Sequence, residues 1–475
     1  MPLFSLSDSE GDSPPLTPVT PPPFNGPSRR LPIELLSEIF LLCVEERMDE
    51  RNTIEIPLLL CSICSRWRDA AISNPLLWSR LSIQLRGSVS KQKTALVDTW
   101  LVRSAACPLT IYVFWEECPF ADNHVVLERL MAHSERWKTM FFYLPYRAFR
   151  SFAAVRNRLP MLTDLSLGTD DDVSLPSPTP SNPSHFNMFE IAPRLRSLEC
   201  VNFSPTILKF PWAQLEEIPL VSGNVEDCLN ILRRGIGLSK ISVIFVEGGP
   251  VNASPIGQYP HVCHNHLTCL TIMTPPWNEV VDLRALFPHL TLPHLETLTI
   301  CNFNSTFGQE FTQFLSRLHT LKTLHLRKTA LPDDQLVDGL KHLTSLTSLI
   351  VLSSSSRPAA AAHGDGESEL TVTRYLLEAL TRNFFSNDAM DGMLLPHLRN
   401  LELTVSSTAA RELDIFIDML QSRLRDDEGL ARLEHVRVRP SVELDAEFLI
   451  RLIELRDFGL EVEVEVEDTA PSEAF

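Results

Sequence analysis

The sequence lacks the features of a membrane or secreted protein. No stretch of its 475 residues approaches the roughly 18 consecutive apolar residues that a membrane-spanning helix needs, so we expect no membrane association. Its N-terminus is polar and proline-rich, unlike a secretory signal peptide. Ten cysteines are scattered without the spacing of a disulfide framework. This pattern favours reduced thiols and a location in the cytoplasm, the nucleus or both.

Positive charge is also scarce. The chain has 42 Lys and Arg against 60 Asp and Glu, a formal net charge of −18. This balance argues against general binding to nucleic acids, which are polyanions. The sequence contains no Walker-type phosphate loop, dinucleotide fingerprint, nucleophile elbow or His-Glu-x-x-His motif. We therefore predict that the chain is not an enzyme and takes no cofactor, with an enzyme of unrecognised type kept as an alternative.

Two clusters contain residues that can bind metals or undergo redox chemistry, but their patterns favour structural roles. His266 precedes a leucine-rich stretch as other histidines of the chain do, and the spacing around it fits no standard zinc finger. Cys61-x-x-Cys64 lies on a predicted helix, where packing is favoured over redox chemistry. The potential zinc ligands occupy nine residues: His261, Cys263, His264, His266 and Cys269.

Short amphipathic helices are predicted near the N-terminus. Pro32 suits the first turn of a helix, because proline lacks the N–H that would have no partner there. An apolar stripe follows it, and a second apolar run begins after Pro57 and ends at Asn74-Pro75, since the residue before proline avoids the helical region. So small a unit buries only ~60% of its unfolded surface, so its remaining apolar stripes suggest a partner or a neighbouring domain. On pattern alone, a plain helical cap on a larger fold remains an alternative.

Three elements in this order resemble the F-box family over residues 28–84. They are Leu31-Pro32-x-Glu34-Leu35-Leu36, then Ile63-Cys64-x-x-Trp67-Arg68, then Pro75-x-Leu77-Trp78. The resemblance implies docking on the Skp-type adaptor of a cullin–RING ubiquitin ligase. Some of the matching residues would hold the helices together instead. The positions that the resemblance assigns to adaptor binding are Leu31, Pro32, Leu35, Leu36, Ile39, Phe40, Ile63, Cys64, Trp67, Leu77 and Trp78.

A repeated kernel, Leu-x-x-Leu-x-Leu, begins at about residue 160. Most copies are separated by ~20–35 residues, the range of leucine-rich and related solenoid repeats. The clear copies are Leu162/Leu165/Leu167, Leu215/Ile218/Leu220, Leu267/Leu270/Ile272, Leu295/Leu298/Ile300, Leu321/Leu324/Leu326, Leu346/Leu349/Val351 and Leu398/Leu401/Leu403, with weaker ones starting at Leu195, Leu238 and Leu433. Amphipathic helices are predicted between them at 311–318, 334–343, 375–384, 413–424 and 448–455.

The fold class predicted from these patterns is α/β. A small all-α N-terminal F-box would precede a leucine-rich-repeat-like solenoid with parallel strands, because stacked strand–helix units bury the faces that single units cannot. A doubly wound α/β sheet is the alternative. The expected division is 1–27 disordered acidic tail, 28–84 F-box, 85–158 linker or capping α/β units, 159–468 solenoid with mobile inserts at 170–185 and 353–369, and 469–475 tail.

The residues between the leucines of each kernel should line the open face of the solenoid. In chain order this face changes from acidic to hydroxyl-rich and then to mixed and basic. We hypothesise that its later part accepts an acidic or phosphorylated segment of a target protein; an ordinary solvated face is the alternative. The residues assigned to this surface are Thr299, Thr323, His325, Arg327, Glu402, Arg437 and Arg439.

The resemblance implies a substrate-recognition subunit of an SCF-type ubiquitin ligase. Its partners would be a Skp-type adaptor, a cullin reached through that adaptor, and an unknown protein substrate. The alternative is an interaction scaffold that works outside any ligase.

Overall fold

A computed structural model describes most of the chain. The described residues are 31–45, 55–85, 91–115, 124–169, 187–202, 208–245, 259–275, 283, 285–302, 308–329, 331–352, 374–382, 393–405, 410–425, 429–440 and 444–465. No helix in these segments is both long and apolar enough to cross a membrane. The expected N-terminal tail, both inserts and the C-terminal tail lie outside the described residues.

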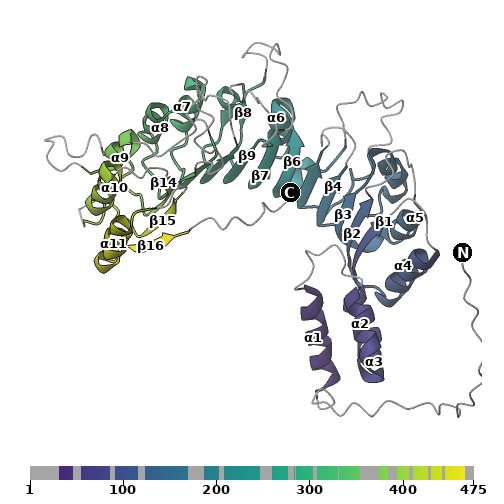
Figure 1. Ribbon diagram of the computed structural model, residues 1–475. Helices are drawn as coiled ribbons and strands as arrows, with labels where there is room; N and C mark the ends of the chain where they lie inside the picture. Colours follow the sequence, from purple (N-terminus) through teal and green to yellow (C-terminus); the bar gives the residue numbers. More distant parts are fainter. Residues whose placement is uncertain are drawn as a thin grey trace, which may run out of the picture.

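One curved sheet of fourteen parallel strands forms the body of the protein (Figure 1). Its strands follow one another in sequence order, whereas a doubly wound sheet reverses its order at a switch point. The sequential order therefore excludes the doubly wound alternative. The strands are β1 (Arg80–Leu85), β2 (Leu109–Trp115), β3 (Trp137–Tyr143), β4 (Asp164–Gly168), β5 (Ser197–Val201), β6 (Glu217–Gly223), β7 (Lys240–Phe245), β9 (Cys269–Met273), β11 (Thr297–Cys301), β12 (Thr323–Arg327), β13 (Ser348–Leu352), β14 (Asn400–Val405), β15 (His435–Pro440) and β16 (Glu461–Val464). A separate two-stranded ladder pairs β8 (Val262–Cys263) with β10 (Leu290–Thr291).

Helices cover the outer side of this sheet, and its inner side faces the hollow of the arch (Figure 1). They are α4 (Lys91–Arg103), α5 (Val125–Met131), α6 (Val225–Arg234), α7 (Gln309–Leu315), α8 (Asp333–Leu340), α9 (Arg374–Leu380), α10 (Ala410–Ser422) and α11 (Ala446–Glu454). The five helices predicted between kernels are all present, and α6 is an addition to them. Asn224 begins α6 with a capping box, in which its side chain accepts from the Asp227 N–H.

The kernel leucines form a continuous core between the strands and the helices. Leu298 and Ile300 of β11 are fully buried, as are Leu324 and Leu326 of β12, while the residues between them are half-exposed. The register places Leu298 beside Leu324 and Ile300 beside Leu326. Each unit therefore buries its apolar residues against the same residues of the next unit.

One kernel differs from its expected pattern. Leu220 was expected to point into the core, but it is only half-buried, and Val221 occupies that position instead. The register shifts by one residue between Ile218 and Val221, which pair with Ile241 and Val243 of β7. Pro219 lies at the shift and lacks the N–H that a regular strand needs, so a β-bulge accommodates it.

A small helical unit precedes the sheet, made of α1 (Ile33–Glu45), α2 (Glu55–Ile63), α3 (Ser65–Ser73) and the 3-10 helix η2 (Pro75–Trp78). The sheet begins immediately afterwards at Arg80. The expected boundary at 158/159 therefore does not mark the start of the solenoid-like sheet, because β1 to β3 already belong to it. The earlier strands escaped the repeat analysis because they are built from aromatic and β-branched residues rather than leucine kernels.

Trp78 joins the helical unit to the sheet. Its ring is buried, and its Nε1–H donates to the carbonyl of Ala71 at 2.7 Å. The ring packs edge-on against Trp100 of α4 with centroids 4.6 Å apart, and the Arg103 guanidinium lies 4.3 Å from its centre. These contacts anchor the unit on the first repeat.

Arg423 is a buried cation that closes the core near the C-terminal end. Its side chain is 1% exposed and donates to the carbonyls of Leu380 at 2.7 Å, Leu394 at 2.8 Å and Leu395 at 3.1 Å. Burial, and secondarily nearby Arg382, lowers the pKa of the Arg423 guanidinium to about 9. The guanidinium thus supplies a donor to each of three carbonyls, of which that of Leu395 also accepts from the Leu398 N–H.

We expect Arg423→Met to lower the free energy of unfolding by about 2–4 kcal/mol, because three buried carbonyls each lose a donor. Arg150→Met, at an exposed position of the 3-10 helix η4 (Tyr146–Val155), should change it by less than about 0.5 kcal/mol. Urea unfolding followed by circular dichroism measures both. Equal stabilities of the two variants would contradict this structural role.

Candidate protein-interaction surfaces

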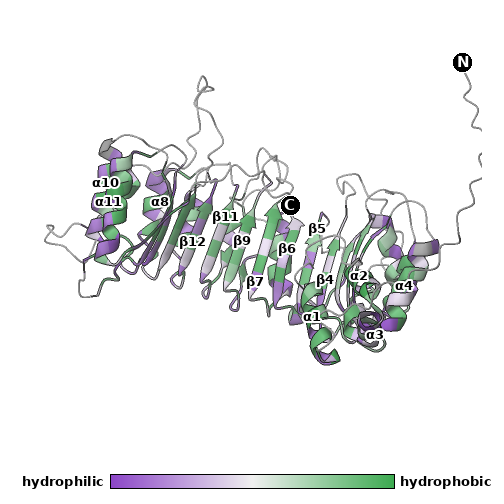
Figure 2. Cartoon of the chain, turned by 60° about the horizontal axis from the view of Figure 1, so that its bottom comes forward, coloured by the Kyte–Doolittle hydropathy of each residue, from purple (hydrophilic) through white to green (hydrophobic). Residues whose placement is uncertain are grey.

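Helix α1 has two apolar faces with different environments. Leu36, Phe40 and Val44 lie one turn apart and are buried in the helical unit. The other face is open, because Leu35 is 50% exposed, Ile39 42% and Leu42 63%. Hydrophobic colour accordingly runs along much of α1 in Figure 2. A helix that is apolar on both sides, with only one side covered, is suited to bind a partner.

The predicted adaptor-binding residues divide between these environments. Pro32, Leu35, Ile39 and Ile63 are exposed, and Leu31, Cys64 and Trp67 are half-buried. Leu36, Phe40, Leu77 and Trp78 are buried. For these last four the assignment to direct docking is corrected: their side chains hold the unit together. A docking variant must therefore avoid Leu36, whose replacement by a charge would disrupt the unit itself.

Exposed apolar side chains concentrate in the helical unit. Of the seventeen large hydrophobic side chains that are exposed among the described residues, nine lie between positions 33 and 76. We call this set the apolar docking surface. It comprises Ile33, Leu35, Ile39, Leu42, Leu58, Leu59, Ile63, Ile72 and Leu76. The motif resemblance assigned only three of these residues, although the helical spacing of Leu42 relative to Leu35 could have identified a fourth.

The core beneath this surface is specific. The rings of Phe40 and Trp67 lie 5.0 Å apart and join α1 to α3. The Arg66 guanidinium donates to the carbonyl of Leu31 where the chain enters α1. The Arg68 Nε–H donates to the Cys61 carbonyl at 2.8 Å. These contacts fix the helices independently of the exposed residues, so the docking surface can be altered without losing its support.

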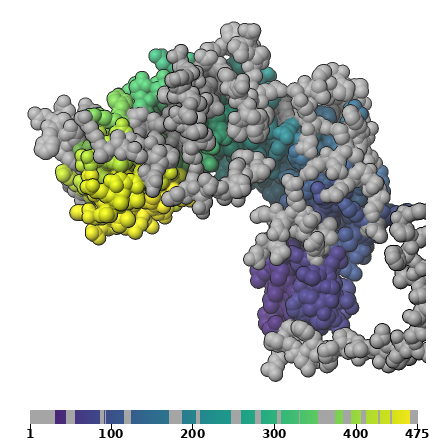
Figure 3. Space-filling view, in the orientation of Figure 1, coloured from purple at the N-terminus to yellow at the C-terminus, as the bar shows by residue number. Residues whose placement is uncertain are grey.

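The inner face of the sheet is the second candidate surface. The two ends of the arch, the helical unit and the last repeats, stand apart with open space between them (Figure 3). Strand register aligns predicted residues in a row across this face, from Thr299 to His325 on β12 and, beyond Ile350, from Glu402 to Arg437 on β15. Thr323 lies in the neighbouring row, beside Thr297 and Ser348. The structure thus brings most of the predicted substrate residues onto one surface.

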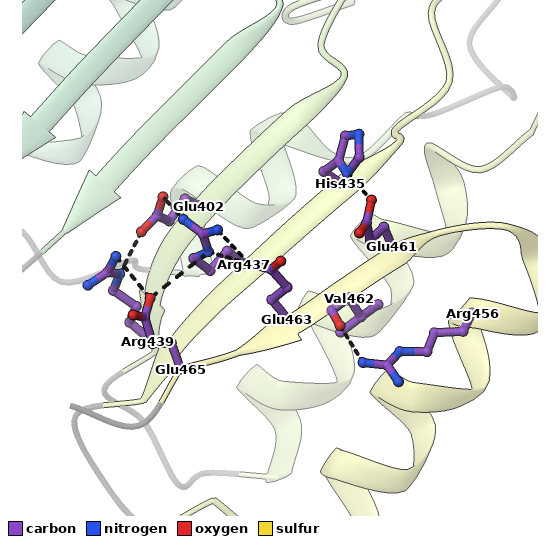
Figure 4. Close-up of polar contacts among 9 residues, drawn as sticks. All are labelled: Glu402, His435, Arg437, Arg439, Arg456, Glu461, Val462, Glu463 and Glu465. Carbon is purple, nitrogen blue, oxygen red and sulfur yellow. Dashed lines mark hydrogen bonds and ion pairs between the residues drawn. The ribbon is translucent and has the colours of Figure 1, made fainter. Parts of the chain in front are cut away.

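The C-terminal part of this face is a lattice of ion pairs (Figure 4). Arg437 pairs with Glu463 at 2.5 Å, and Arg439 pairs with Glu402 at 2.5 Å and with Glu465 at 3.0 Å. Three carboxylates therefore surround two arginines. The expectation of a basic surface here is corrected, because every arginine of β15 is neutralised by β14 or β16.

His325 and Arg327 have a different setting. His325 is half-buried and Arg327 is exposed at the end of β12. Burial lowers the pKa of the His325 imidazole, with Arg327 and Arg439 adding to the effect and Glu402 opposing it. Such a histidine is neutral at physiological pH and adds no positive charge to the face. The arginines of β15 form ion pairs with neighbouring glutamates. Arg327 forms no such pair with the described residues of the inner face.

An aromatic cluster occupies the N-terminal part of the inner face. Tyr112 stacks on Phe141 with centroids 5.8 Å apart, and Phe114 lies 5.0 Å from the same ring. All three rings are half-exposed. Sequence analysis did not assign them to a surface, although alternation in both strands, with Tyr112 and Phe114 on the same side of β2, carried the signal.

His264, within the cysteine and histidine cluster, is held by backbone groups. His264 is buried, its Nε2 lies 2.9 Å from the Gly235 carbonyl, and its Nδ1 accepts from the backbone N–H of Leu267. It therefore serves as a connector between loops. Within the segments that the structure describes, no group of three or more potential ligands could hold a metal ion. Cys61 and Cys64 are free thiols, and burial raises the pKa of Cys61, which disfavours its reactive thiolate.

Comparison of the sequence with protein-family models and with curated proteins finds no match to either.

The ion-pair lattice should contribute unequally to stability. The Glu402 side chain is 12% exposed and joins both arginines, whereas Glu217 is 43% exposed and pairs only with Lys240. We expect Glu402→Gln to lower the free energy of unfolding by about 1–2 kcal/mol, because it weakens charge-assisted bonds in a shielded site. Glu217→Gln should cost less than about 0.5 kcal/mol. Urea denaturation of both variants at low and high salt checks this; an equal cost would show that the lattice has no special role.

Proposed function

We propose that this protein is the substrate-recognition subunit of an SCF-type ubiquitin ligase. In this proposal the helical unit is an F-box that binds a Skp-type adaptor, and the repeat region is a leucine-rich-repeat-like solenoid that binds a target protein. The observation that carries the proposal is the apolar docking surface, which lies on the helices that bear the F-box-like motif.

Burial free energy supports a partner for this surface. Leu35, Ile39 and Leu42 remain substantially exposed, and covering apolar area contributes roughly 25 cal/mol per Å². Large exposed apolar patches mark interaction sites, and nine exposed apolar side chains lie on the helices of this unit. Phe40 and Trp67 pack against each other inside the unit. The residues of the apolar docking surface are therefore not needed for this packing and can contact a second chain.

The arrangement also suits a recognition subunit. The unit is anchored through Trp78 to the first repeat, so an adaptor bound there would be held in a fixed relation to the inner face. A target bound on that face would then be kept at high effective concentration near the ligase. Ubiquitin transfer itself would be performed by the partners.

The proposal predicts that Leu35→Asp/Ile39→Asp reduces capture of a recombinant Skp-type adaptor by at least about tenfold. Two charges would be placed in an apolar contact, where an unpaired charge is strongly unfavourable. Because both residues are exposed, circular dichroism and the unfolding midpoint should remain unchanged. Binding is measured by pull-down and by surface plasmon resonance with the full chain.

Ile450→Asp/Ile453→Asp on α11 is the matched control, since these isoleucines are 58% and 49% exposed and lie in the last repeat. It should retain adaptor binding. Recovery of adaptor together with cullin from cells supports a ligase, and recovery of adaptor alone supports a scaffold. Undiminished capture by the Leu35→Asp/Ile39→Asp variant would refute the docking surface.

A further inference from the structure

A hollow of about 210 Å³ opens on the inner face across β13 to β16. Its lining includes Ile350 of β13, Glu402 of β14, His435 and Arg437 of β15, and Glu461 and Glu463 of β16. The register places Ile350 directly beside Glu402, so an apolar side chain and carboxylates meet in one depression.

The charge of this region is negative although arginines lie within it. Glu402, Glu463 and Glu465 pair with Arg437 and Arg439, and Glu461 lies beside His435. Leaving His435 aside, these four carboxylates exceed the two arginines by two negative charges. The partner of Glu461 is His435, 2.6 Å away, which is a cation only when protonated. Glu461 therefore has no permanent counter-charge, and its carboxylate is 63% exposed at the rim of the hollow.

We infer that this hollow binds a lysine or arginine side chain from a basic segment of the target protein. The long aliphatic stem of such a residue would lie against Ile350, and its cationic head would bind Glu461 and Glu463 at the rim. An acidic or phosphorylated segment would meet the excess of carboxylates and be repelled. The inference rests on the proposed function in one respect: it takes the bound segment to belong to the target of the ligase. Binding at the hollow does not require adaptor docking.

The aromatic cluster on β2 and β3 supports the same ligand class from a separate position. The faces of aromatic rings attract cations, and Tyr112, Phe114 and Phe141 are half-exposed on the inner face. A second basic residue of the same partner could therefore bind against these ring faces.

The test measures binding of two fluorescein-labelled peptides to the full chain by fluorescence anisotropy. One peptide alternates Lys with Ala over eight residues, and the other replaces each Lys with Glu. We expect saturable binding of the lysine peptide and none of the glutamate peptide. Glu461→Gln/Glu463→Gln should weaken the lysine peptide about tenfold, because it removes both carboxylates at the rim.

The matched control is Glu447→Gln/Glu454→Gln, which removes two exposed carboxylates from α11 in the same repeat and reduces the net negative charge by the same amount. It should change affinity less than twofold. Ile350→Lys provides a second variant, since it places a competing cation in the hollow and leaves every carboxylate present; it should also weaken the peptide.

Three results would overturn the inference: no saturable binding of the lysine peptide, comparable binding of the glutamate peptide, or equal losses in the two double variants. The last would mean that the peptide responds only to overall charge. Adaptor capture is measured separately on the same preparations. If the unaltered chain captures adaptor but does not bind the lysine peptide, this inference alone is refuted. If it binds the peptide but does not capture adaptor, the ligase proposal alone is refuted.

Discussion

The whole structure depends on the packing of each strand and helix against the neighbouring units of the sheet. A single strand with its helix leaves leucines such as Leu324 and Leu326 uncovered, and only the adjoining units bury them. The parallel ladder runs without interruption from β1 to β16, which are its two edge strands among the described residues. At the C-terminal edge, Glu461 and Glu463 alternate with valines, and such charge discourages pairing with a second chain.

The same lateral geometry determines the electrostatics of the inner face. Residues that meet on it are about one repeat apart in sequence, as Arg437 and Glu463 are, and they come together only through register. The charge of this sheet face therefore depends on adjacent strands together rather than on any one strand. The arginines of β15 look basic when their strand is considered alone, yet their neighbours make that region acidic.

The strand–helix repeats could be predicted from the sequence because the spacing of the leucines identifies which residues of each strand face the core. Where a side chain's role depends on distant partners, the sequence was insufficient. Phe40 and Leu35 belong to the same motif, but only the packing of α1 against Trp67 separates the buried residue from the exposed one. Pro219 lacks an N–H and causes a β-bulge, so Val221 rather than Leu220 points into the core. The proline is visible in the sequence and could have predicted this shift. Arg423 gave no local signal, since its acceptors are carbonyls up to 43 residues away.

Arg423 has a consequence for how the fold tolerates change. It ties the carbonyl of Leu380, at the end of α9, to those of Leu394 and Leu395, where the chain returns towards β14. One side chain therefore binds both the end of α9 and the residues that precede β14. Lengthening the chain between such fixed anchors costs only a slowly growing closure entropy. The tie that Arg423 makes between the end of α9 and the residues before β14 therefore does not depend on the length of chain that joins them.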